Sequence, residues 1–111
     1  MTKTIPECPM ATLQNMISGK WKIYILWLLA QRIWRFNELQ RQLGDVTQAM
    51  LTRQLRELEK DGLIMREVFP EVPPRVEYSL SPLGKSFSEL LGVMYDWAAL
   101  NIPSPYVRKK Q

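Results

Sequence analysis

The sequence contains no histidine, and this absence removes several kinds of chemistry. Histidine is the commonest general base and metal ligand, and it activates the nucleophile in Ser-His and Cys-His sites. With a single cysteine in 111 residues, no zinc site of the usual kinds and no internal disulfide can form. Carboxylates alone could still act as acid and base, but no pair is marked out by its surroundings. We therefore expect no enzyme, no metal and no cofactor.

Long apolar runs and glycine-rich phosphate-binding motifs are missing as well. The most apolar stretch, Ile23–Ala30, is far shorter than the roughly 18 residues that span a bilayer. Neither G-x-G-x-x-G nor G-x-x-x-x-G-K-[ST] occurs. The first residues lack the basic-then-apolar pattern of a signal peptide, and the lone cysteine suits a reducing compartment. These absences predict a cytoplasmic protein without a membrane partner.

What the sequence does contain is an ordinary apolar content and a modest basic excess. The hydrophobic fraction is 46% and the length is 111 residues, which predicts one globular domain over 1–111. The formal net charge is +4, compatible with a nucleic-acid partner without being diagnostic. Arginines are concentrated between Arg32 and Arg56, so the basic excess is local.

The segment Val46–Gly62 is predicted to form one helix, over about 47–61. Thr47 is a good N-cap and Gly62 suits the left-handed position that ends a helix. The apolar stripe consists of Leu51, Leu55 and Leu58. The opposite face, with its flank, carries Gln48, Ala49, Thr52, Arg53, Arg56 and Lys60. Arginine can bind guanine, glutamine can bind adenine, and a methyl group can contact thymine. A merely solvated amphipathic helix is the alternative, and the neighbouring segments decide between the two.

Those neighbours predict a winged helix-turn-helix, a mainly α fold with a small β-hairpin. Helices are expected at about 9–17, 20–30 and 36–43, the second of them buried on most sides. A glycine-bearing turn joins the helix at 36–43 to the next one, as in a helix-turn-helix. Strands at 63–69 and 75–80 flank a proline-rich loop, and a last helix covers 82–100 with a bend or break at Gly92. A short strand is expected at 33–35, with Trp34 exposed or capping the core.

With these elements in order, the chain resembles the HxlR-type winged helix-turn-helix regulators, relatives of the MarR group. The similarity runs from about Cys8 to Trp97, and it departs at 31–34, where many members have a glycine-bearing turn. The matching pieces are Cys8-Pro9, GKWK at 19–22, RFNEL at 35–39, LTRQLRELEKDGL at 51–63, PPRVEYSL at 73–80 and Leu83-Gly84. The resemblance implies a homodimer on a pseudo-palindromic operator in double-stranded DNA. It also implies a recognition helix at about 47–61, a wing at about 64–80 and dimerisation helices at about 9–17 and 82–100.

The place of a residue on the helix-turn-helix predicts whether it contacts DNA, with an ordinary solvated side chain as the alternative at each position. We assign base contacts to Gln48, Ala49, Thr52 and Arg53. Phosphate contacts are assigned to Arg56, Arg35 and Arg41. Arg75 could reach a narrow minor groove from the wing, or it could pair with Glu71 or Glu77 instead.

The apolar residues of the first and last helices exceed what a small core needs. We therefore expect an interface between two protomers, with a core role or a small pocket as alternatives. The interface residues would be Leu13, Ile17, Phe87, Leu91, Met94 and Trp97.

Cys8 lies at or next to the expected start of the first helix. The positive end of a helix dipole favours the thiolate form, and Lys20 and Lys22 could add to that effect. Several regulators that resemble this chain sense oxidants or electrophiles with a cysteine at this position. The alternative is a buried, inert thiol. Without a second cysteine, oxidation would give a bond between protomers or a mixed disulfide, and alkylation is the other route.

Together these features predict a DNA-binding transcriptional regulator, of the repressor kind, that responds to oxidants or electrophiles through Cys8. A regulator controlled by a small molecule, with an inert Cys8, is one alternative. A winged helix that binds only protein is another, and acidic residues on the outer face of the 47–61 helix would favour it.

Overall fold

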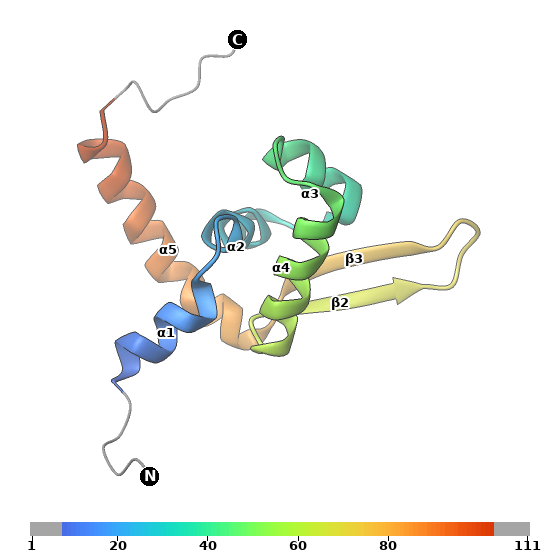
Figure 1. Cartoon of the computed structure of the whole chain (residues 1–111), viewed down its shortest axis with the longest axis horizontal. Helices are drawn as coiled ribbons and strands as arrows, with labels where there is room; N and C mark the ends of the chain where they lie inside the picture. The colour runs from blue at the N-terminus through green and yellow to red at the C-terminus, as the bar shows by residue number, and fades with distance from the viewer. Residues whose placement is uncertain (1–7, 104–111) are drawn as a thin grey trace.

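The structure is a computed structural model, and it describes residues 8–103. Five α-helices and three β-strands follow one another along this part of the chain (Figure 1). In order they are α1 (Pro9–Ile17), α2 (Lys22–Gln31), β1 (Trp34–Arg35), α3 (Phe36–Leu43), α4 (Gln48–Lys60), β2 (Ile64–Phe69), β3 (Arg75–Leu80) and α5 (Pro82–Asn101).

Helix α4 begins and ends at the residues that the sequence predicts. The hydroxyl of Thr47 accepts a hydrogen bond from the backbone N–H of Met50 at 3.0 Å, which satisfies one free donor of the first turn. After Lys60 the chain reverses at Gly62, whose φ of +81° is a conformation that other residues rarely adopt. These local signals place α4 directly between α3 and the hairpin.

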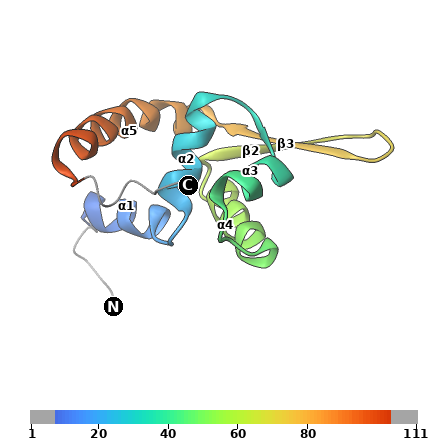
Figure 2. The same cartoon turned by 90° about the horizontal axis from the view of Figure 1, so that it is seen from above.

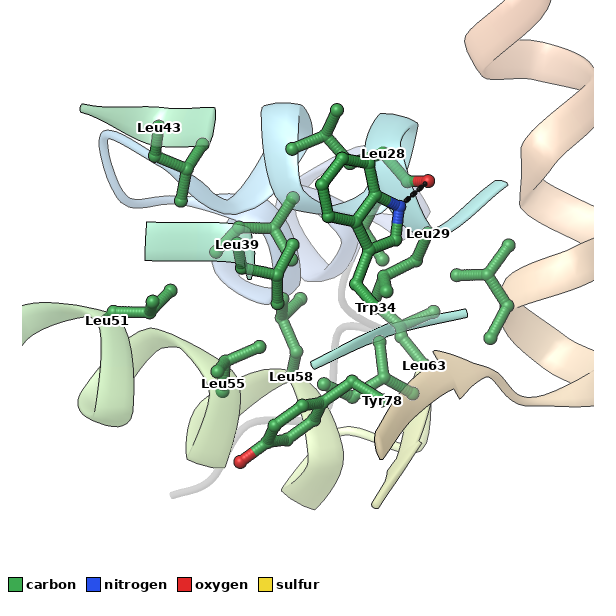
Figure 3. Close-up of a cluster of buried hydrophobic side chains, with 14 of the residues drawn as sticks. Leu28, Leu29, Trp34, Leu39, Leu43, Leu51, Leu55, Leu58, Leu63 and Tyr78 are labelled. Atoms are coloured by element: carbon green, nitrogen blue, oxygen red, sulfur yellow. Dashed lines mark hydrogen bonds between the residues drawn. The ribbon is translucent and has the colours of Figure 1, made fainter. Parts of the chain in front are cut away.

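The sheet has three strands in the order β1-β3-β2, all antiparallel. The short strand β1 is confirmed, and its pairing of Trp34 with Tyr78 ties the helical part to the hairpin. The expectation that Trp34 is exposed was wrong. Its ring is buried, and its indole N–H donates to the carbonyl of Leu28 at 2.7 Å (Figure 3). A buried N–H needs such an acceptor.

The core gathers leucines from three helices around the inner face of the sheet. Leu51, Leu55 and Leu58 of α4 point toward Leu39 of α3 and the aromatic ring of Tyr78 (Figure 3). All three α4 leucines are fully or almost fully buried, so the predicted apolar stripe is confirmed.

The hairpin and the two terminal helices lie at opposite ends of the molecule. In both views β2 and β3 extend away from the body, whereas α1 and α5 lie at the far side of α2 (Figures 1 and 2). Helix α5 continues through Gly92, so the expected break is absent. Helix α2 is less enclosed than predicted, because Ile23 and Tyr24 are exposed. No helix within 8–103 has the length and apolarity needed to cross a membrane.

A close contact between backbone segments fixes the direction in which the chain leaves β3 and enters α5. The Ser81 hydroxyl donates to the carbonyl of Gly62 at 2.6 Å and accepts from the N–H of Gly84 at 3.0 Å. At Gly84 an added Cβ would lie 2.1 Å from the carbonyl oxygen of Leu63, far inside van der Waals contact. A side chain there must therefore push α5 away from the start of β2.

Replacing Gly84 by alanine should destabilise the fold, because rigid backbone has to move. We expect a loss of about 1–3 kcal/mol or more in the free energy of unfolding. Gly92→Ala is the matched control, since a Cβ at Gly92 meets no atom within 4 Å. The control should be neutral or more stable by up to about 1 kcal/mol, as alanine favours helix over glycine. Urea denaturation at one fixed protein concentration measures both. Equal stability of the two variants would contradict this account of the contact.

Candidate nucleic-acid interface

The outward face of α4 is open to solvent along its first three turns. Gln48, Ala49, Arg53 and Arg56 are exposed, and Thr52 is half-buried at the edge. The leucine stripe on the other side holds the helix against the body, so this face is presented rather than covered. Its side chains offer amide, hydroxyl, methyl and guanidinium groups, the set that can bind base edges in a major groove.

A groove of about 390 Å³ separates α4 from the hairpin. Its polar lining includes Gln48, Thr52 and Arg56 from α4 and Arg66 from β2, with Glu59 as the acidic member. The structure thus brings three of the predicted DNA residues to one side of the molecule. Phe36, Leu55, Val76 and Tyr78 form its floor and walls.

Arg66 is a candidate that the sequence reasoning missed. It pairs in register with Tyr78 in the middle of the hairpin, and it faces the same groove as Arg56. The sequence could have indicated Arg66, because alternation along the strand at 64–69 places residue 66 on one defined face. Two guanidinium groups on opposite walls of a groove could hold a phosphate backbone between them.

Two other predicted arginines lie outside this groove: Arg35 is the last residue of β1 and the N-cap of α3, and Arg41 is in α3. Both side chains are exposed, at the start and in the last turn of the helix. The carboxylate of Glu38 accepts from the backbone N–H of Arg35 at 3.0 Å and from the Arg32 guanidinium at 3.2 Å. These two hydrogen bonds, the backbone one first, hold the pKa of Glu38 below its ordinary value. An ionised carboxylate therefore caps α3.

Arg75 is held by the two acids that were the alternative to a DNA contact. Its guanidinium pairs with Glu71 at 2.7 Å and with Glu77, and it lies 3.8 Å from the centre of the Phe69 ring. The hydrogen bond from Arg75 lowers the pKa of Glu71, and Glu71 in turn raises the pKa of Arg75. In this structure Arg75 stiffens the hairpin next to its turn, and it would have to leave both carboxylates to reach DNA.

Arg53 has a partner that links it to the interior. Its Nε donates to Oε2 of Glu57 at 3.3 Å, and Oε1 of Glu57 lies 2.7 Å from the ammonium of Lys22 on α2. The Lys22 side chain is only 3% exposed. These two hydrogen bonds, with Lys22 as the larger cause, lower the pKa of Glu57. The sequence reasoning missed this chain of ion pairs because residues 22 and 57 are far apart in sequence.

The comparisons with known proteins agree on one family. The HxlR-like helix-turn-helix family matches residues 16–106. The chain belongs to this family. An HTH-type transcriptional regulator of Methanothermobacter thermautotrophicus is 48% identical over 93 residues, which cover 84% of this chain and 71% of the relative.

Solved structures of regulators show the same fold. The redox regulator HypR in its oxidized form is 42% identical with a TM-score of 0.82, over 86% of this chain and 99% of that chain. A MarR-family transcriptional regulator from Porphyromonas gingivalis is 34% identical with a TM-score of 0.82, over 92% and 100%. The chain is therefore a DNA-binding transcriptional regulator with a winged-helix fold, and not an enzyme.

In this HxlR-like regulator Cys8 is the N-cap residue of α1, as predicted, and it is exposed. Within the single chain the thiol is therefore not buried. The ammonium of Lys22 is buried against Glu57. The ammonium of Lys20 lies 5.0 Å from the centre of the Trp21 ring. An exposed thiol at a helix N-terminus is open to a second thiol or to an electrophile.

The predicted interface residues fall into three groups. Met94 and Trp97 are exposed on α5, while Leu13, Ile17 and Phe87 are half-buried where the terminal helices meet the body. Leu91 needs a correction, because at 3% exposure it belongs to the protomer's own core. Further exposed apolar residues on or just after α5 are Leu83, Leu90, Val93, Tyr95, Leu100 and Ile102. The HxlR-like chain thus has an exposed apolar face on α5 that its other helices and strands leave largely uncovered.

Proposed function

We propose that this regulator is a homodimeric repressor in which α4 is the recognition helix and the β2–β3 hairpin is the wing. The observation that carries the proposal is the outward face of α4, which joins arginine, glutamine and threonine beside a groove with Arg56 and Arg66 on its walls. The alternative, a winged helix that binds only protein, predicts acidic residues on the outward face of α4, but this face carries amide, hydroxyl and guanidinium groups. Since its partner is DNA, we place the protein in the cytoplasm.

Base reading and phosphate binding would be divided along α4. Gln48, Ala49, Thr52 and Arg53 face outward in the first two turns, where recognition helices usually contact bases. Arg56 and Arg66 flank the groove toward the wing, and we assign them to the phosphate backbone. Arg35 at the N-cap of α3 and Arg41 in its last turn would add phosphate contacts. Phosphate contacts position the protein, and base contacts supply its selectivity.

Arg53→Ala and Arg56→Ala should separate these two roles. A duplex enriched by the wild-type protein from a random pool serves as the selected site, and a shuffled duplex of equal length is the control. Arg53→Ala should weaken the selected site by about 1–3 kcal/mol and bring it closer to the shuffled one. Arg56→Ala should weaken both alike and reduce the salt slope by about one per protomer. Fluorescence anisotropy over a salt series measures both, and an equal loss on both duplexes from Arg53→Ala would refute its role.

The dimer would form through α1 and α5, at the end of the molecule far from the wing (Figure 2). A cluster of exposed apolar side chains on one helix is unfavourable in water, and Trp97 is 62% and Leu100 86% exposed. A second copy would cover the face of α5 and would match the symmetry of a two-fold operator.

Trp97→Glu should therefore shift the protein from dimer to monomer, because the interface would have to bury a carboxylate. Val72→Glu, at the turn of the hairpin, makes the same exchange of an exposed apolar residue for an acid and should leave the dimer intact. Sedimentation equilibrium over a range of protein concentrations measures the association of each variant. A monomeric wild type, or a Trp97→Glu dimer of unchanged strength, would be incompatible with the proposed interface.

Cys8 would provide the signal input of this regulator. It is exposed at the start of α1, one of the two helices assigned to the dimer interface. The similar protein HypR is named a redox regulator and has been solved in an oxidized form. Oxidation would join Cys8 to its counterpart in the partner or to a small thiol, and alkylation would modify it directly. Each product changes the α1 end of the interface, and with it the spacing of the two recognition helices.

Diamide should change DNA binding by the wild-type protein and leave Cys8→Ser unaffected. Anisotropy with the selected duplex reports binding, and a non-reducing gel shows whether a linked dimer forms; dithiothreitol should reverse both effects. If wild type and Cys8→Ser behave alike in diamide, the thiol is inert. A regulator controlled by a small molecule would then be the better explanation. The apolar hollow of about 380 Å³ between α2 and α5 is the site to examine for that molecule.

A further inference from the structure

We propose that Lys22 and Glu57 are positioning residues for Arg53, so that a lysine on α2 sets the sequence selectivity of α4. The inference rests on the proposed function in one respect, namely that Arg53 reads a base. It adds a determinant of selectivity that does not touch DNA itself.

The charged side chain of Lys22 is buried, and the carboxylate of Glu57 compensates for its charge. This side chain is 3% exposed and its Nζ lies 2.7 Å from Oε1 of Glu57. An ammonium is retained in such a place only when an anion compensates for its lost hydration. The pair therefore fixes the Glu57 carboxylate relative to α2. Because it is so buried, Lys22 cannot contact a phosphate or a base.

Glu57 uses its two oxygens for two different cations. Oε1 is bound to Lys22, and Oε2 accepts from Nε of Arg53. Lys22 also neutralises a carboxylate that would otherwise repel phosphates close to the recognition face. The lowered pKa of Glu57 agrees with a carboxylate that stays ionised between two donors.

Arg53 gains a defined direction from this arrangement. Its side chain is 71% exposed, so without a partner the guanidinium would sample many rotamers and lose that freedom on binding. Since Nε is the atom bound to Glu57, both terminal nitrogens stay available for the O6 and N7 acceptors of a guanine. The fork that reads the base is thus oriented before DNA arrives.

A second contact holds the same part of the chain against α4. Gly19, in the turn before α2, lies so close to Gln54 that an added Cβ would be 2.7 Å from its Oε1. Gln54 is buried and precedes Glu57 by three residues, which is one helical turn. Residues 19–22 therefore contact α4 at two successive turns. This support fixes the position from which Lys22 holds Glu57.

The test compares selectivity, measured as the ratio of dissociation constants for the shuffled and the selected duplex at one salt concentration. Lys22→Met keeps a long side chain and removes the charge. It should lower the ratio about three- to tenfold, less than Arg53→Ala, which removes the base contact itself. Lys20→Met is the matched control, since Lys20 is exposed. It should leave the ratio unchanged, because Lys20 lines the hollow between α2 and α5 and not the groove at α4.

A double-mutant cycle decides whether Lys22 acts through Arg53. In an Arg53→Ala background, Lys22→Met should cause no further loss of selectivity. If Lys22→Met lowers the ratio equally in both backgrounds, or no more than Lys20→Met does, the inference is overturned. If Arg53→Ala alone leaves the ratio unchanged, the proposed base contact has failed instead, and the inference fails with it.

Glu57→Gln keeps the test valid if thermal melting shows that Lys22→Met does not fold. The amide retains the size of the carboxylate but replaces one of its two oxygens by an NH2 group, which cannot accept. Lys22 and Arg53, which bind different oxygens of Glu57, would therefore no longer have one acceptor each. Selectivity should again fall in the wild-type background and stay unchanged in the Arg53→Ala background. An unchanged ratio for Glu57→Gln would overturn the inference.

Discussion

The burial of one leucine stripe on α4 is the contact on which the rest of this structure depends. Leu51, Leu55 and Leu58 are withdrawn from water almost completely, and each buried side chain of this kind contributes about 1.5–3 kcal/mol. Because the stripe occupies one side of the helix, the other side remains free for polar groups. The same packing that stabilises the domain therefore presents Arg53 and its neighbours to the solvent.

Helix α2 connects the two ends of the molecule. Ile25 and Leu26 lie in the centre of the core, while Lys22 holds the α4 carboxylate and Trp27 stacks on Tyr95 of α5 at a ring distance of 4.7 Å. A displacement of α5 or α1 in the proposed dimer would thus act on an element that also supports the recognition face. Well-packed interiors transmit such displacements because they contain few voids that could absorb them.

Ion pairs gather at the end of the molecule that is assigned to DNA. Acidic partners restrain several arginines of the DNA end: Glu38 binds Arg32, Glu57 binds Arg53, and both Glu71 and Glu77 bind Arg75. Exposed pairs of this kind add little to stability. Their larger effect is to limit the directions in which a long side chain can point. For a protein that reads DNA, fewer directions mean less entropy lost on binding.

The sequence by itself determined the order and the approximate bounds of the helices and strands, the cap at Thr47, the turn at Gly62 and the outward face of α4. These features depend on local spacing, on capping groups and on backbone preferences, all of which can be read from neighbouring residues. Only the tertiary structure decided that Trp34 is buried, that Leu91 belongs to the core, that Arg75 is paired and that Lys22 reaches Glu57. Those outcomes depend on which segments distant in the chain come together, because burial and ion pairing are properties of the packed molecule rather than of any local stretch.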